Sequence, residues 1–223
     1  MRAVLKHELR DYFNSLPTYL FCAFLLCFVG VGAMLYNIQS AVANFEYVLQ
    51  FVSIGMAVII PILTMRSISE ERRQKTDQLL YSLPIRISDI VAGKYLAMLI
   101  IFLIPVCIIA VFPLIFSQFG EVYLPTSYGS LFAFFMMGAA MIAFGMFVSS
   151  MTDSQALAAG IAIVILMLNY FKIPGFMEKI SLFEKFNGFV SGVFDISSIV
   201  FYVTVIIFFL FLTVQSLERR RYS

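Results

Sequence analysis

The chain has few charged residues, one histidine and no tryptophan. Charged residues make up 13% of its 223 residues and hydrophobic residues 61%, whereas an ordinary soluble domain carries about 25% charged residues. Mean hydropathy is +0.96. The net charge of +2 is too small to indicate binding to nucleic acid. Composition therefore predicts an integral membrane protein and leaves little sequence for a separate soluble domain.

Ionisable residues are missing from the long apolar stretches. No Asp, Glu, Lys, Arg or His occurs in 13–44, 47–65, 95–120, 122–152, 154–171 and 196–217. Proton-driven carriers rely on such groups within the membrane, so self-powered transport is not expected. Paired carboxylates, a serine with a histidine, and metal-ligand spacing are equally missing there, so no catalytic, cofactor-binding or metal-binding residue is predicted.

Cysteine is scarce, and its spacing matches no metal or disulfide framework. Cys22, Cys27 and Cys107 all fall inside apolar runs. We expect them to pack as small apolar side chains.

What the chain does have is long apolar runs. Six of them predict transmembrane helices, at about residues 17–36, 47–69, 88–116, 128–150, 154–171 and 196–216. Runs of about 20 residues cross roughly 30 Å of hydrocarbon as helices, and they are too long and uninterrupted for barrel strands. Pro105 and Pro113 predict a kink in the third run. The fold class predicted is all-α, a polytopic membrane protein with one transmembrane domain over residues 1–223.

The basic residues are unevenly distributed among the loops. Twelve of the 15 Lys and Arg residues lie before the first charge-free stretch, between the second and third such stretches (residues 66–94), or after the sixth. By the positive-inside rule that side is cytoplasmic, and an even number of spans puts both termini there.

Residues 1–15 form a predicted amphipathic helix at the membrane interface. Its apolar face consists of Leu5, Leu9, Tyr12, Phe13 and Leu16. Its polar face consists of Arg2, Lys6, Arg10 and Asn14. Such a helix serves either as a surface anchor or as a docking site for a partner, and both interpretations stay open. His7, beside the polar face, is expected to be solvated.

A polar segment, residues 66–84, separates the second and third runs. Its charges would each cost about 2.5 kcal/mol or more in hydrocarbon, so it must face water or a partner. Thr76 or Asp77 can cap a short helix, 76–83, that exposes leucines and ends before Pro84. The leucines either insert into a groove on another protein or fold back on the membrane surface.

Pairs of small residues mark faces where helices can approach closely. They are Ala139 with Ala143, Ala156 with Gly160, and Gly188 with Gly192. Packing within the chain and a dimer face are both compatible with these pairs.

These segments resemble ABC-2 type permeases, the membrane subunits of ATP-driven exporters. Residues 65–73, 79–84 and 90–97 resemble the conserved cytoplasmic loop of that family, and residues 5–17 resemble its start. Residues 183–195 are most similar to the gliding-motility-associated subgroup. The resemblance covers essentially the whole chain and is specific for the family, not for a substrate.

The resemblance implies a six-span subunit in a bacterial plasma membrane. Its partners would be a second permease chain, the same or homologous, and two cytoplasmic ATPase subunits that bind ATP and magnesium, so this chain needs no cofactor. Residues 76–83 would be the coupling helix in an ATPase cleft. Residues 175–195 would form short re-entrant helices on the outside. An extracellular accessory subunit is a further candidate partner, although the loop 37–46 is shorter than in many subgroup members.

The resemblance also implies site residues. The expected ATPase-coupling interface is Glu70, Glu71, Arg72, Arg73, Thr76, Asp77, Leu79, Leu80 and Leu83. The expected connecting helix beside it uses Leu5, Leu9, Arg10, Tyr12 and Phe13.

The function expected is a permease subunit that moves substrate when partner ATPases close on ATP. This chain has no Gly-x-x-x-x-Gly-Lys-Ser/Thr motif of its own, so it is not expected to be an enzyme. The alternative is a scaffold or channel-like subunit that acts without ATP. Lipid, peptide, drug, ion-linked and polysaccharide substrates all stay open.

Overall fold

All regular elements in the part of the chain that the structure describes are helices. The computed structural model describes residues 2–39, 44–73, 86–118, 122–171 and 181–221. Its elements are α1 (Arg2–Phe13), α2 (Leu16–Gly32), the π-helix η1 (Ala33–Ile38), α3 (Glu46–Thr64), α4 (Arg66–Arg73), α6 (Ile87–Ile109), α7 (Phe112–Phe116), α8 (Leu124–Met151), α9 (Gln155–Tyr170), α10 (Leu182–Val190) and α11 (Ile196–Arg221). The predicted all-α class is confirmed.

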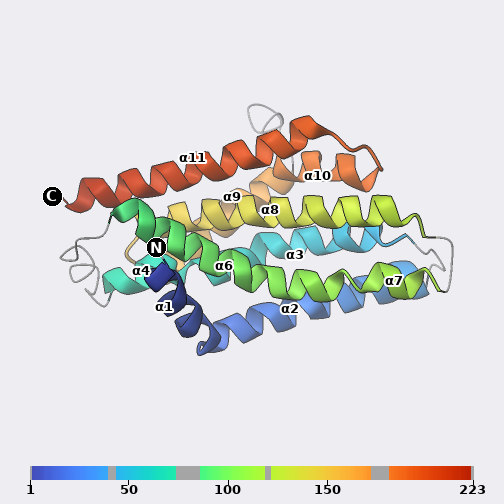
Figure 1. Cartoon of the computed structure of the whole chain (residues 1–223), viewed down its shortest axis with the longest axis horizontal. Coiled ribbons are helices and arrows are strands. Elements are labelled where there is room, and N and C mark those ends of the chain that lie inside the picture. The colour runs from blue at the N-terminus through green and yellow to red at the C-terminus, as the bar shows by residue number, and fades with distance from the viewer. Residues whose placement is uncertain (1, 40–43, 74–85, 119–121, 172–180, 222–223) are drawn as a thin grey trace.

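The long helices run side by side along the long axis of the bundle, and both chain termini lie at the same end (Figure 1). Five helical stretches are long and apolar enough to cross a membrane: Leu16–Ile38, Glu46–Glu70, Ile87–Phe116, Leu124–Met151 and Ile196–Arg219. The sixth predicted span corresponds to α9, whose 16 residues reach about 24 Å. A multi-pass membrane protein is therefore supported, while the count of six stays a prediction.

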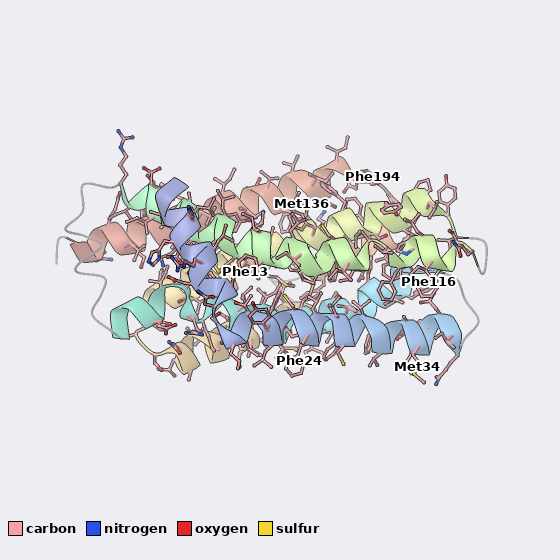
Figure 2. The ribbon with its side chains drawn as sticks, turned by 60° about the horizontal axis from the view of Figure 1, so that its bottom comes forward. Phe13, Phe24, Met34, Phe116, Met136 and Phe194 are labelled. Atoms are coloured by element: carbon pink, nitrogen blue, oxygen red, sulfur yellow. The ribbon has the colours of Figure 1, made fainter. Side chains whose placement is uncertain are left out.

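The outside of the bundle is apolar. Large hydrophobic side chains project from it (Figure 2), and Phe24 and Met34 are each 55% exposed. Ile207 and Phe211 on α11 are exposed to a similar degree. A soluble monomer rarely exposes so large a continuous apolar surface, whereas lipid covers it at no cost.

The centre of the bundle is α8, which packs against α3, α6, α9, α10 and α11. Ala139 and Ala143 are buried inside the chain, so this predicted small-residue pair serves intramolecular packing. Gly138 permits a closer approach, because a Cβ there would overlap the Phe102 ring and lie 2.7 Å from Met56 Cε. By contrast, Gly160 on α9 faces open space, with nothing within 4 Å of an added Cβ.

The third span is interrupted next to Pro113, as predicted, but not at Pro105, which lies inside the continuous helix α6. α6 ends at Ile109 and α7 begins at Phe112, with Pro113 in its first turn. Proline lacks an N–H and its ring fixes φ, so it fits a helix start better than a helix interior. The helix starts at Ile87, so Ser88 and Asp89 lie in its first turn, and the N-cap residue Arg86 makes no side-chain cap hydrogen bond.

At the end of the bundle opposite the termini, α10 is tied to three long helices. Ser130 Oγ on α8 donates to the Phe189 carbonyl at 3.1 Å, and Tyr202 OH on α11 donates to the Leu182 carbonyl at 2.7 Å. Gln50 on α3 donates to Asn187 Oδ1 at 3.3 Å. A helix occurs in the predicted outer segment 175–195, but residues 172–180 lie outside the described part, and re-entry into the membrane stays a prediction.

Two carboxylates at this end have defined roles. Glu46, the first residue of α3, is buried, and its Oε1 accepts from Ser127 Oγ on α8 at 2.7 Å. Asp195 precedes α11 and accepts from the Ser197 amide and the Ser198 hydroxyl, both at 3.0 Å. The bond from the Ser197 amide, with that from Ser198, lowers the pKa of the Asp195 carboxyl. Asp195 is thus the N-cap residue of α11, and its side chain accepts from an amide of the first turn.

We expect Gly138→Val to destabilise the bundle by about 1–3 kcal/mol, because the added atoms must displace Phe102 and Met56. Gly160→Val is the matched control, since its Cβ meets open space. Thermal unfolding of both variants in detergent measures the difference. Equal melting temperatures would show that α8 does not pack as described.

Candidate functional site

The helices α1 and α4, which carry many of the charged residues, lie at the end of the bundle where the termini lie (Figure 1). We call this the polar end; it comprises α1, α4, the start of α6 and the last turns of α8 and α11. Among the predicted coupling residues, Glu70 is described in full. Glu71, Arg72 and Arg73 belong to α4, but their side chains are not described. The others, Thr76, Asp77, Leu79, Leu80 and Leu83, lie outside the described residues together with the predicted coupling helix.

The helices α4 and α6 lie on either side of residues 74–85 in the chain. The contacts that fix these two helices therefore fix the two ends of that segment. The second predicted span does not run straight into the polar segment. It breaks at Met65, where α3 ends and α4 begins.

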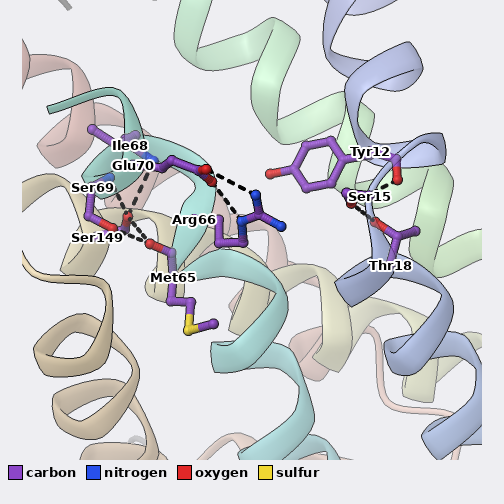
Figure 3. A network of polar contacts seen from close by, with 9 residues as sticks. All are labelled: Tyr12, Ser15, Thr18, Met65, Arg66, Ile68, Ser69, Glu70 and Ser149. Atoms are coloured by element: carbon purple, nitrogen blue, oxygen red, sulfur yellow. Dashed lines mark hydrogen bonds and ion pairs between the residues drawn. The ribbon is translucent and has the colours of Figure 1, made fainter. Parts of the chain in front are cut away.

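Ser149 of α8 bridges this break (Figure 3). Its Oγ donates to the Met65 carbonyl at 3.2 Å and accepts from the amides of Ile68 and Ser69 at 3.3 and 3.2 Å. In an uninterrupted helix the Ser69 amide would donate directly to the Met65 carbonyl. Here the Ser149 hydroxyl, from another helix, is inserted between these two backbone groups. Ser149 is fully buried, and water could not easily replace it.

A glycine one turn earlier on α8 makes this bridge possible. A Cβ on Gly145 would overlap Thr64 Oγ1 and lie 2.9 Å from Thr64 Cβ. Only glycine allows α8 to approach the last turn of α3 so closely. Ser149 therefore reaches the break because Gly145 brings the two helices together.

On the other side of α4, Glu70 pairs within its own helix. Arg66 Nε and Nη2 donate to the two Glu70 carboxylate oxygens at 2.6 and 3.0 Å, and both side chains are about 30% exposed. Figure 3 shows the Tyr12 ring of α1 pointing toward this pair. Glu70 was expected, with Arg72 and Arg73, to contact the ATPase. Within this chain its carboxylate pairs with Arg66, and the contact with the ATPase stays a prediction.

The predicted interfacial helix α1 is a helix, and it packs against α6. Glu8 Oε1 on α1 and Lys94 Nζ on α6 form an ion pair at 2.7 Å, with side chains only 13% and 4% exposed. Val4 Cγ1 would lie 3.0 Å from a Cβ on Gly93. A buried ion pair and close packing therefore hold α1 on the start of α6, in addition to any contact that α1 makes with lipid.

The residues predicted for α1 differ in how far their side chains are buried. Leu5, Leu9 and Tyr12 are half-buried, whereas Arg10 is exposed and Phe13 is 43% exposed. His7 is exposed as expected, although Nδ1 lies 2.9 Å from Asp11 Oδ2.

Glu8, Lys94 and Ser149 were missed by sequence reasoning. A signal existed for Lys94, because a lysine just inside an apolar run needs a carboxylate partner or water. Nothing in the sequence singled out Ser149 among the serines. Within the described ranges, no three His, Cys, Asp or Glu side chains group so as to hold a metal ion.

We expect Ser149→Ala to weaken the α3–α4 junction by about 1–2 kcal/mol, since two helix-start amides lose their acceptor. The amides of Ile68 and Ser69 should then exchange with deuterium faster. Ser150→Ala is the control, because Ser150 is equally buried but donates only to Phe147 of its own helix. Unchanged exchange in Ser149→Ala would contradict the bridge.

We expect Lys94→Ala to release α1 from α6, at a cost of about 3 kcal/mol, because Glu8 is left buried without its partner. Limited proteolysis within residues 2–13 measures the release, and Lys6→Ala, on the exposed side of α1, is the control. The double variant Glu8→Leu with Lys94→Met should regain most of the protection. Protection of α1 in Lys94→Ala would show that the pair does not hold the helix.

Comparison with known proteins identifies the family. No curated protein matches the chain. The family model described as ABC-2 family transporter protein matches residues 2–217, nearly the whole chain. The match covers α1, both sides of the α3–α4 junction, the central helix α8 and all but the end of α11. The gliding-motility subgroup stays a prediction. The chain therefore belongs to the ABC-2 family of transporter proteins, as a membrane permease component.

Proposed function

We propose that this chain is the transmembrane permease subunit of an ATP-driven exporter. It forms the substrate pathway with a second permease chain, and cytoplasmic ATPase subunits that bind ATP and magnesium supply the energy. The observation that carries the proposal is the family match over residues 2–217. Both termini lie in the cytoplasm in this proposal, because the basic residues concentrate at the polar end.

The chain's own residues support an external source of energy. Its long apolar stretches carry no ionisable residue that could relay protons at mid-membrane. The buried charges that the structure describes belong to its two ends: Glu46 pairs with Ser127 at one, and Lys94 pairs with Glu8 at the other. The segment between α4 and α6, which includes the proposed coupling helix 76–83, is the point where ATPase movement enters.

The contacts at the polar end explain how such a movement would spread. A shift of the coupling helix acts on α4 and α6 together, because they are its two neighbours in the chain. Ser149 transfers the shift of α4 to α8, and Lys94 transfers the shift of α6 to α1. α8 in turn holds α10 through Ser130, so both ends of the bundle move together. The second permease chain completes the cavity that this motion opens and closes.

Purification in mild detergent tests the proposal. We expect an ATPase subunit with a P-loop motif to co-purify with the tagged chain and to be identified by mass spectrometry. A gene for such a subunit beside this one would support the same conclusion. Recovery of the chain without any ATPase in several detergents would favour the scaffold or channel-like alternative.

Charge reversal of Glu70 and Glu71, or Leu79→Asp, should uncouple ATP hydrolysis from transport while membrane insertion stays intact. We expect transport to fall by about tenfold or more, as when one partner of an interface charge pair is lost. ATPase activity of the reconstituted complex, measured beside transport, reports the coupling. Normal transport in these variants with the ATPase present would overturn the assignment.

The Arg66–Glu70 pair requires a control, because reversing Glu70 also breaks a contact within α4. The exchange of Arg66→Glu with Glu70→Arg restores that contact but reverses both charges. If Glu70 contacts the ATPase, the exchange stays uncoupled. If Glu70 only stabilises α4, the exchange restores coupling.

A further inference from the structure

A cleft opens at the polar end between the last turns of α8 and α11. It measures about 600 Å³, within the range of small-molecule sites. Phe147 and Met151 line it from α8, and Leu212, Gln215, Ser216, Glu218 and Arg219 line it from α11. None of these residues belongs to the predicted coupling interface or to the contacts that hold α1 and α4.

The polarity of the cleft changes along the helix axis. Leu212 lies nearest the middle of the membrane and, with Phe147, gives the cleft an apolar floor. The Phe209 ring, 5.7 Å from that of Phe147, extends this apolar surface inward. Gln215, Glu218 and Arg219 follow toward the end of α11, where the exposed side chains are polar. A lipid has the same gradient, from acyl chain to headgroup.

The polar rim carries both signs of charge. Arg219 supplies a guanidinium and Gln215 an amide N–H, which are donors suited to a phosphate. Glu218 supplies a carboxylate, which accepts from an ammonium and repels an anion. Ser216 is committed to another role, since its Oγ donates to the Ser150 carbonyl at 3.3 Å and ties α11 to α8.

We propose that this cleft binds one phospholipid whose headgroup carries a phosphate and a primary ammonium. The phosphate accepts from Arg219 and Gln215, the ammonium donates to Glu218, and an acyl chain lies along Leu212 and Phe147. A lipid with only a phosphate leaves Glu218 beside an anion. A quaternary ammonium cannot donate a hydrogen bond to Glu218. The proposal does not depend on ATP-driven export.

Lipid retention by the purified full chain tests the proposal. The probe is an equimolar mixture of phosphatidylethanolamine, phosphatidylcholine and phosphatidylglycerol with matched acyl chains, and native mass spectrometry counts the lipids that stay bound. We expect phosphatidylethanolamine to be retained roughly tenfold over the other two, the effect of one charge-assisted hydrogen bond. Equal retention of the three lipids would overturn the proposal.

Variants separate the two ends of the headgroup. Glu218→Gln should abolish the preference for phosphatidylethanolamine, and Arg219→Gln should reduce retention of all three lipids. Leu212→Trp, which fills the floor, should also reduce all three. Asp11→Asn and Lys6→Gln remove charges of the same signs on α1, away from the cleft, and should change nothing. Retention that is unchanged in Glu218→Gln and Arg219→Gln, or a protein segment found cross-linked in the cleft, would refute the assignment.

Discussion

A break in a membrane-spanning helix leaves backbone amides and carbonyls that hydrocarbon cannot satisfy, and this constraint governs the arrangement of the bundle. The break at Met65 is tolerated because the buried Ser149 hydroxyl both donates and accepts there. That contact requires α8 to lie close to α3, which Gly145 permits. The close packing of α8 on the end of α3 thus also satisfies polar groups at the break.

The polar end combines two kinds of attachment. The hydroxyl bridge from Ser149 and the ion pair between Glu8 and Lys94 are both buried, so each would be costly to break. The Arg66–Glu70 pair is about 30% exposed and contributes less to stability. Buried contacts therefore attach α4 to α8 and α1 to α6, while the more exposed pair lies within α4. Such firm attachments on both sides of residues 74–85 are what the coupling role proposed for that segment requires.

Much of the fold could be predicted from composition and hydrophobic run length. The helical class and the positions of the long spans follow from the cost of burying charge and backbone in lipid. The break near Pro113 follows from the missing N–H and fixed φ of proline. All of these are local properties of the sequence. The sixth span stays a prediction, because α9 has only 16 residues and apolar runs of that length need not cross a membrane. The re-entrant segment stays a prediction because residues 172–180 lie outside the described part.

The sequence by itself determined that this chain is a helical membrane protein with a charged segment between its second and third spans, since each of those properties depends on residues near one another in the chain. Only the tertiary structure decided which residues meet. Ser149 lies 84 positions from Met65, and Lys94 lies 86 from Glu8. Residues so far apart leave no periodic pattern in the sequence. The sequence around a single serine or lysine does not say which distant residue it will contact. Their contacts exist because close helix packing brings residues that are distant in the sequence together in buried, low-polarity surroundings.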